Sequence, residues 1–230
     1  VNAAEKTLYL ADKGRLSSAP APESEKNGFD EYVSNPAKPV PYTMKTSIRY
    51  NRDYFVEDQR FAASRPDVLV FATEPLAEDM TIAGPIRAEL YVSTTGTDAD
   101  WVVKVIDVYP DDAPDPKTNP AGIRMAGYQR LIRGEIFRGK FRESFEKPVP
   151  CVPGRVAKVA FDLPDVQHAF LKGHRLMVQV QSSWFPLFDR NPQTFCDIRT
   201  AGEEAFRKAT HRVYRTSRYP SRLSFKVAAE

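Results

Sequence analysis

Apolar side chains recur at every second position through much of this chain. Residues 86–92 are the clearest example, because each apolar residue is followed by Arg87, Glu89 or Tyr91. The same alternation occurs in residues 157–163, 175–181 and 223–227. A period of two is typical of antiparallel strands that bury one face. In residues 175–181 it places Leu176, Val178 and Val180 inside the protein and Gln179 and Gln181 outside.

Residues 101–108 follow a different pattern, since both faces carry apolar side chains. This pattern predicts a central strand that is covered on both sides. Residues 7–10 read as one short strand that ends in a turn. One short helix is predicted near residues 200–208, where Thr200 and Glu203 have the spacing of a capping box.

Turn-forming residues separate these segments, and about nine or ten strands fit between them. The sequence therefore predicts an all-β fold with at most one or two short helices, and among such folds a jelly-roll β-sandwich. No alternation of strands and helices is visible, which excludes a Rossmann unit or an α/β-hydrolase sheet within these residues.

Proline is frequent, with 19 in 230 residues, and several prolines gather in residues 17–41 among Ser, Glu, Lys and Asn. That stretch has no apolar periodicity, so we expect an extended connector along the surface. The predicted organisation is a strand plus Pro-rich connector over residues 1–41 and a sandwich domain over residues 42–230.

Composition and charge exclude several classes of protein. A hydrophobic content of 42% and a charged content of 27% are those of a globular chain. The formal net charge is only +3, and the basic residues of segment 124–142 are diluted by acidic ones, which favours a salt-bridged strand face over a nucleic-acid site. The longest apolar run, residues 68–72, is far below the roughly 18 residues of a membrane span.

Few residues suggest chemistry of their own. The sequence contains no G-x-S-x-G nucleophile elbow. Its three histidines are scattered, so we expect no metal site and no cofactor. Cys151 and Cys196 lack a CxxC pattern, and we expect both to be reduced. The acidic loop 107–115 lacks the glycine and glutamate of an EF-hand, which favours a solvated turn, with a different type of calcium loop as the alternative.

The segment 184–188, Trp-Phe-Pro-Leu-Phe, is the densest unusual feature of the chain. Three large aromatic residues with a proline can form a sugar-binding platform, a contact surface for another domain, or a packed corner. The sequence alone favours a corner or a contact surface over a platform.

Several short runs taken together resemble one family. They include residues 56–61 (VEDQRF), 65–70 (RPDVLV), 73–76 (TEPL), 84–85 (GP), 98–104 (DADWVVK), 106–111 (IDVYPD), 133–135 (RGE), 153–154 (PG), 172–175 (KGHR), 181–186 (QSSWFP) and 189–193 (DRNPQ). In this order they are similar to the C-terminal domain of the X-Pro dipeptidyl-peptidase and cocaine-esterase type of serine hydrolases. The resemblance is strongest to the α-amino-acid ester hydrolases and glutaryl (cephalosporin) acylases, and it spans about residues 7–227.

The resemblance implies a jelly roll of galactose-binding-like topology that packs on an α/β-hydrolase domain and a helical cap. In that family the catalytic Ser, Asp and His belong to the hydrolase domain, so none is carried onto this sequence. The chain begins at Val1 rather than Met, and on this reading we expect it to be a piece of a longer enzyme. Export from the cell and assembly into homo-oligomers are implied by resemblance only.

Two functions stay open at this point. One is a non-catalytic domain that stabilises a serine acyl hydrolase and shapes its active-site entrance; the other is a free-standing module that binds carbohydrate or protein. For the first, the resemblance makes Tyr42 and Met44 candidates for a substrate-facing wall. Trp184, Phe185 and Phe188 are candidates for the interface with the hydrolase domain.

Overall fold

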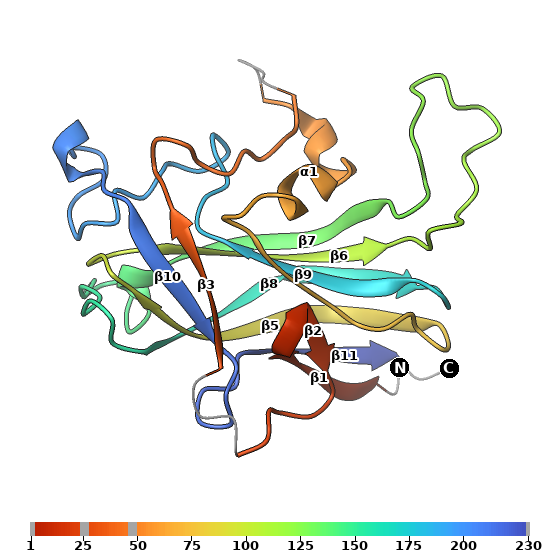
Figure 1. Ribbon diagram of the computed structural model, residues 1–230, viewed down its shortest axis with the longest axis horizontal. Coiled ribbons are helices and arrows are strands. Elements are labelled where there is room, and N and C mark those ends of the chain that lie inside the picture. Colours follow the sequence, from red (N-terminus) through yellow and green to blue (C-terminus); the bar gives the residue numbers. More distant parts are fainter. Residues whose placement is uncertain (1–2, 24–27, 46–49, 229–230) are drawn as a thin grey trace.

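The computed structural model describes residues 3–23, 28–45 and 50–228 (Figure 1). Its strands are β1 (Ala3–Ala11), β2 (Arg15–Ser17), β3 (Phe29–Ser34), β4 (Leu69–Ala72), β5 (Met80–Thr94), β6 (Asp100–Val108), β7 (Gln129–Arg138), β8 (Ala157–Phe170), β9 (Arg175–Gln181), β10 (Ala209–Tyr214) and β11 (Arg222–Ala228). Helical structure is limited to α1 (Arg60–Ala63) and the short 3₁₀ turns η1 (Asp12–Gly14), η2 (Arg52–Phe55), η3 (Gly139–Phe141) and η4 (Glu203–Ala205). The expected helix near residue 200 is only η4.

The strands form two layers, and hydrogen bonds between neighbouring strands link both layers into one continuous sheet. One layer has the order β4-β9-β6-β7, and the other has β3, β10, β11 and β1 on one side of β5 and β8 on its other side. β2 joins the layers, since it is antiparallel to β1 and meets β4 in parallel at the single pair Arg15–Ala72. The all-β sandwich predicted from the alternation is confirmed.

The two layers enclose the main apolar core. Its fully buried members come from both layers and include Ile82, Ile86, Leu90, Phe170, Leu176, Val178 and Leu223. The period-two pattern placed all of these inside except Ile82 and Phe170, which lie outside the alternating segments, and the core also contains Val159, Phe161 and Leu163 of β8. The pattern and the packing therefore agree for β5, β8, β9 and β11.

β6 is the central strand that its sequence predicts. It pairs with β7 on one side and β9 on the other, and its residues 100–107 are buried. Val103 and Val105 enter the core between the layers, while Val102 and Ile106 enter a second cluster on the opposite face. Loops, rather than a third sheet, cover that opposite face.

The same loops explain an error in the sequence prediction for β9. Gln179 and Gln181 were expected to face solvent, but both are fully buried. Their Nε2 groups donate to Gln59 O at 3.4 Å and to Ser183 O at 2.7 Å. The alternation identified the correct face, but it could not show that loops distant in sequence cover this face.

The predicted connector also holds a strand that the sequence analysis missed. β3 forms the edge of its layer beside β10, with Tyr32 and Ser34 buried. Its outward side carries charge, and Glu31 pairs with Arg212 at 2.9 Å. Two buried residues give too short an apolar alternation to detect from sequence. The role of residues 1–41 as a link to another domain stays a prediction.

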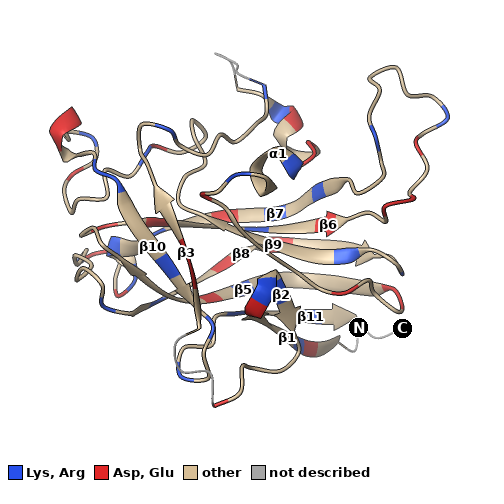
Figure 2. Cartoon of the chain, in the orientation of Figure 1, with Lys and Arg blue, Asp and Glu red and all other residues tan. Residues whose placement is uncertain are grey.

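Charged residues are interspersed over the surface (Figure 2). The basic stretch forms local contacts: Arg138 makes a paired contact with the buried Asp100 at 3.0 and 3.1 Å, and Arg142 binds backbone carbonyls at residues 139, 149 and 150. Within the described residues, no helix is long and apolar enough to cross a membrane.

The buried His211 gives the fold a specific response to acid. The imidazole lies between the rings of Tyr32 and Trp101 and bonds through Nε2 to Gln193 Oε1 at 2.7 Å. Burial lowers the pKa of His211 to about 3. Because an unfolded histidine titrates near 6.5, the unfolded state gains a proton first, so stability falls as the pH drops from about 6.5 toward 3.

We predict that His211→Gln removes this part of the acid sensitivity. In the unmodified chain, this group lowers the free energy of unfolding by up to about 1.4 kcal/mol per pH unit below pH 6.5. Urea unfolding at several pH values between about 4.5 and 7 measures the slope, with His168→Gln as the histidine control. Equal slopes in His211→Gln and the unmodified chain would contradict the prediction.

Candidate functional site

Two loop segments cover the outer face of β6 and β7 and expose large apolar side chains. The first is described at residues 42–45 and 50–56, and the second is residues 184–188. We call this set the apolar surface: Met44, Tyr50, Phe55, Val56, Phe185 and Phe188, each between 36% and 61% exposed. Solvent-exposed apolar groups that gather on one side of a soluble domain indicate an interaction site.

Backbone hydrogen bonds join the two segments. Tyr42 N donates to Phe185 O at 2.9 Å, and Phe185 N donates to Val40 O at 3.0 Å, so the segments run side by side. Pro41 and Phe185 form the corresponding parallel bridge. A shift of either segment would therefore move both halves of the apolar surface.

A buried layer of rings supports the exposed residues. Tyr54 contacts Trp184 edge to face, with 5.8 Å between ring centres, and Trp184 stacks on Phe188 at 6.1 Å. Tyr42 contacts Tyr54 at 5.3 Å. Burial and the neighbouring tyrosines raise the pKa of Tyr54, so its phenol stays neutral and serves as packing. Such aromatic pairs contribute about 0.5–1.5 kcal/mol beyond area burial.

A pocket of about 460 Å³ opens within the apolar surface. Its walls include Phe55, Phe188 and the buried Trp184, with Leu131 and Gly134 of β7 also lining it. Gly134 provides the space for the indole, since a Cβ there would lie only 2.7 Å from Trp184 Cη2.

The five predicted site residues differ in exposure. Met44, Phe185 and Phe188 are exposed, whereas Tyr42 and Trp184 are only 3% and 4% exposed. The two buried rings belong to the supporting layer, in which Tyr42 contacts Tyr54 and Trp184 contacts Phe188. The assignment of the five residues to a substrate wall and a domain interface stays a prediction.

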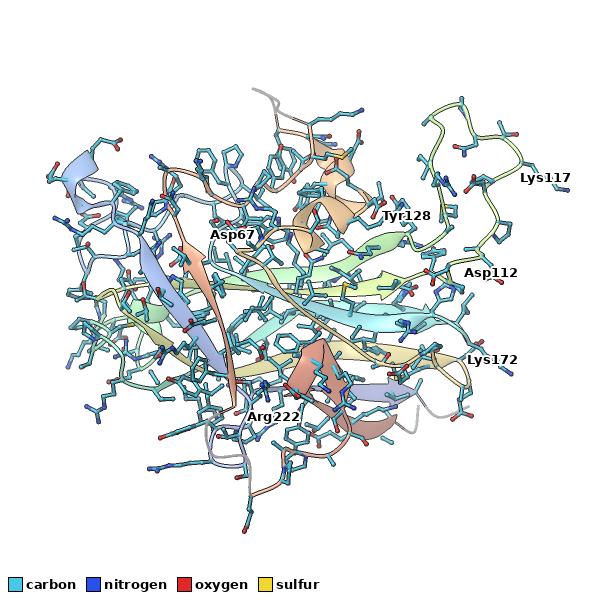
Figure 3. The ribbon with its side chains drawn as sticks, viewed as in Figure 1. Asp67, Asp112, Lys117, Tyr128, Lys172 and Arg222 are labelled. Atoms are coloured by element: carbon cyan, nitrogen blue, oxygen red, sulfur yellow. The ribbon has the colours of Figure 1, made fainter. Side chains whose placement is uncertain are left out.

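Residues 50–56 are the part of the apolar surface that sequence reasoning missed. Tyr50, Phe55 and Val56 have no alternation, but their density of aromatic residues among charged ones was an available signal. Tyr128, beside α1 in Figure 3, fixes this segment because its hydroxyl donates to Val56 O.

Outside the apolar surface, a polar cluster contains two of the histidines that are scattered in the sequence. His168 Nε2 and His174 Nδ1 lie 2.9 and 2.8 Å from separate oxygens of Asp107, which is buried. Asp107 therefore does not belong to a solvated turn, contrary to the expectation for the acidic loop. Across the described residues, no group of three or more His, Cys, Asp or Glu side chains is arranged to hold a metal ion.

Within the described residues, the side chains of Ser182, Cys151 and Cys196 show no hydrogen bond to a histidine. Ser182 Oγ pairs with Tyr32 Oη at 2.5 Å, while His174 pairs with Asp107, so these groups do not form a catalytic triad. Cys151 and Cys196 are free thiols, and burial raises the pKa of Cys151. The apolar surface is thus the candidate functional site.

The model of the X-Pro dipeptidyl-peptidase C-terminal non-catalytic domain matches residues 1–224. This chain belongs to that family. Solved structures similar to this X-Pro dipeptidyl-peptidase C-terminal domain include an aminopeptidase from a marine sediment archaeon, Thaumarchaeota archaeon, with 49% identity, a TM-score of 0.90, and coverage of 99% of this chain and 37% of that one. A selenomethionine-labelled α-amino acid ester hydrolase has 46% identity and a TM-score of 0.89, covering 97% of this chain and 36% of its own.

Among curated proteins, the cocaine esterase of Rhodococcus sp. (strain MB1 Bresler) is 34% identical over 194 residues, which are 84% of this chain and 31% of the esterase. The chain thus spans about a third of the length of the relatives it matches. The family resemblance and the non-catalytic character expected from the sequence are confirmed.

We predict that Gly134→Ala displaces Trp184 in this X-Pro dipeptidyl-peptidase C-terminal domain. The added methyl group would lie 2.7 Å from Trp184 Cη2 and 3.4 Å from Lys104 Cγ, so the indole must move. We expect a loss of about 1–3 kcal/mol in the free energy of unfolding and a changed tryptophan emission.

Gly202→Ala is the matched control, because the three atoms nearest to its new methyl would all belong to the flexible carboxylate end of Glu204. Unchanged stability and emission in Gly134→Ala would show that the contact between Gly134 and the indole does not fix the floor of the pocket.

Proposed function

We propose that this domain packs on the catalytic domain of a serine acyl hydrolase through the apolar surface and forms one wall of its active-site entrance. The observation that carries the proposal is the gathering of exposed apolar side chains on two described segments that backbone hydrogen bonds and ring contacts join to each other. The similarity to a solved aminopeptidase and a solved α-amino acid ester hydrolase supports the choice of a peptide or an ester as the class of substrate.

Within this proposal the predicted residues take distinct parts. Met44, at 61% exposure, is the candidate for contact with substrate. Tyr42 is buried and supports this part of the surface through ring contacts with Tyr50 and Tyr54. Phe185 and Phe188 are the candidates for contact with the catalytic domain, with Trp184 as their buried support. Interfaces between domains of one chain typically bury about 600–1,500 Å², which a surface of this kind can supply.

The reading frame around this sequence tests the proposal directly. We expect it to encode, in frame, a segment with a G-x-S-x-G nucleophile elbow. A frame that encodes only this domain would contradict the proposal and would favour the alternative, a free-standing module that binds carbohydrate or protein.

We predict that the 230-residue chain alone does not hydrolyse activated esters or peptides. Enzymes that lose a triad still keep about 10³–10⁴-fold catalysis from their oxyanion hole and substrate binding, but this domain would supply neither. The measurement is turnover of a chromogenic ester by repurified chain. Turnover that survives repurification and alanine replacement of the surface Lys and His residues would contradict the prediction.

We also predict that the chain binds the catalytic domain in trans and that Phe188→Asp weakens this binding at least tenfold. A tenfold change in Kd corresponds to about 1.4 kcal/mol, a modest consequence of placing a carboxylate in an apolar interface. Phe145→Asp is the control, because Phe145 is 77% exposed and lies outside the apolar surface. Titration calorimetry measures both variants.

Equal losses in Phe188→Asp and Phe145→Asp would show that the apolar surface is not the interface. Self-association of the chain alone, abolished by Phe188→Asp, would instead assign the surface to contacts between copies of this domain.

A further inference from the structure

Lys104 lies in the middle of β6 on the face that the loops cover, and its side chain is fully buried. Its register partners are Gly134 of β7 and Gln179 of β9. Lys104 Nζ donates to Gln59 Oε1 at 3.1 Å and lies 5.3 Å from the centre of the Trp184 ring. A lysine is almost never fully buried without a partner of opposite charge, and no ion pair to its amine is found among the described residues.

The amine of Lys104 is linked to both loop segments of the apolar surface by contacts through Gln59 and Trp184. In the first loop, Gln59 Nε2 donates to Glu57 O at 2.9 Å, and Glu57 Oε2 accepts from Met44 N at 3.0 Å. In the second loop, the Trp184 ring supports Phe188. One side chain of the central strand thus connects to exposed residues in both halves of the surface, to Met44 through three successive hydrogen bonds and to Phe188 through the Trp184 ring.

Polar atoms around the amine are incompletely bonded. Trp184 Nε1 and Gln179 Oε1 are buried and have no hydrogen-bond partner within the described part of the chain. Unsatisfied buried groups of this kind typically destabilise a protein by about 1–3 kcal/mol each. The site is therefore sensitive to small changes in the position or charge of Lys104.

We propose that Lys104 is a positioning residue for the apolar surface, and that proton uptake by its amine moves Gln59 and Trp184, because the new charge is buried without an ion-pair partner among the described residues. The partner of that surface rests on the proposed function, whereas the link between Lys104 and the loops rests on the contacts of this chain alone.

The amine of Lys104 changes its protonation state near neutral pH. Burial lowers the pKa of its amine to about 7, and the carboxylate of Glu57 acts in the opposite direction. The other groups that pack around it, Gln59, Gly134, Gln179 and Trp184, carry no charge. A protonated amine has three N–H donors, and among the described residues the amine makes one hydrogen bond, to Gln59 Oε1.

The sign of the effect follows from the two protonation states. The pKa of an unfolded lysine is about 10.4, so the folded chain gives up this proton at lower pH than the unfolded chain does. The stabilisation due to the neutral amine is fully present above the unfolded pKa of about 10.4, and it is lost as the pH falls from there toward 7. Below pH 7 the charged amine favours arrangements that admit water, and these require Gln59 or Trp184 to move.

Tryptophan emission of the 230-residue chain, titrated between about pH 6 and 9, tests the proposal. We expect one transition near pH 7 that disappears in Lys104→Met, which keeps the length of the side chain but has no amine. Trp184→Phe should also remove the transition, which assigns the signal. Lys172→Met is the control and should keep it, because Lys172 lies exposed at the turn between β8 and β9, away from α1 (Figure 3).

A transition that persists with the same midpoint in Lys104→Met would overturn the proposal, and so would a flat emission in the unmodified chain. If Lys104→Met fails to fold, Lys104→Gln provides the same comparison. A purely structural role for Lys104 would change stability in these variants but would produce no transition to lose.

Binding to the catalytic domain, measured over the same pH range, separates the two proposals. We expect Kd to rise as the pH falls through 7 and to become independent of pH in Lys104→Met. A titrating emission without binding at any pH would contradict the proposed function and support the positioning role. Binding with an emission that does not change with pH would contradict the positioning role of Lys104 and support the proposed function.

Discussion

The outer face of the β6 layer must be covered, and much of this structure follows from that requirement. β6 carries apolar side chains on both faces, so one sheet packed against it buries only half of them. The loops before α1 and after β9 bury the other half, and they bring Tyr42, Tyr54 and Trp184 over Val102 and Ile106. The side of these loops that faces away from β6 forms the apolar surface, so the surface is a by-product of completing the core.

This arrangement explains why polar groups lie beneath aromatic ones. Lys104, Gln179 and Gln181 would face solvent in an ordinary sandwich, and the covering loops enclose them instead. Some of their hydrogen bonds are made to the loops, as between Lys104 Nζ and Gln59 Oε1, and some buried polar atoms keep no partner among the described residues. The loops are therefore attached to the sheet by a few directional contacts as well as by apolar packing. That combination can hold a surface in place while leaving it responsive to charge.

The sequence predicted what depends on local periodicity and missed what depends on distant segments. Strands β5, β8, β9 and β11 follow from the alternation of their side chains, and β6 follows from its two apolar faces. The burial of Gln179 and the pairing of His168 with Asp107 depend on chain segments far away in sequence, which no local pattern contains. For the site, dense aromatic residues drew attention to segment 184–188, but its contact with Tyr54 and its backbone pairing with residues 40–42 required the fold.

The antiparallel pairing of β1 with β11 has a mechanical consequence. Ala3 lies opposite Ala228, so the two ends of the described chain leave the sandwich side by side (Figure 1). A force that pulled these ends apart would open the β1–β11 ladder one residue pair at a time, as a zipper opens, instead of loading all its hydrogen bonds together. Tension would therefore be relieved at this edge first, while β6 and the loops above it stayed in place.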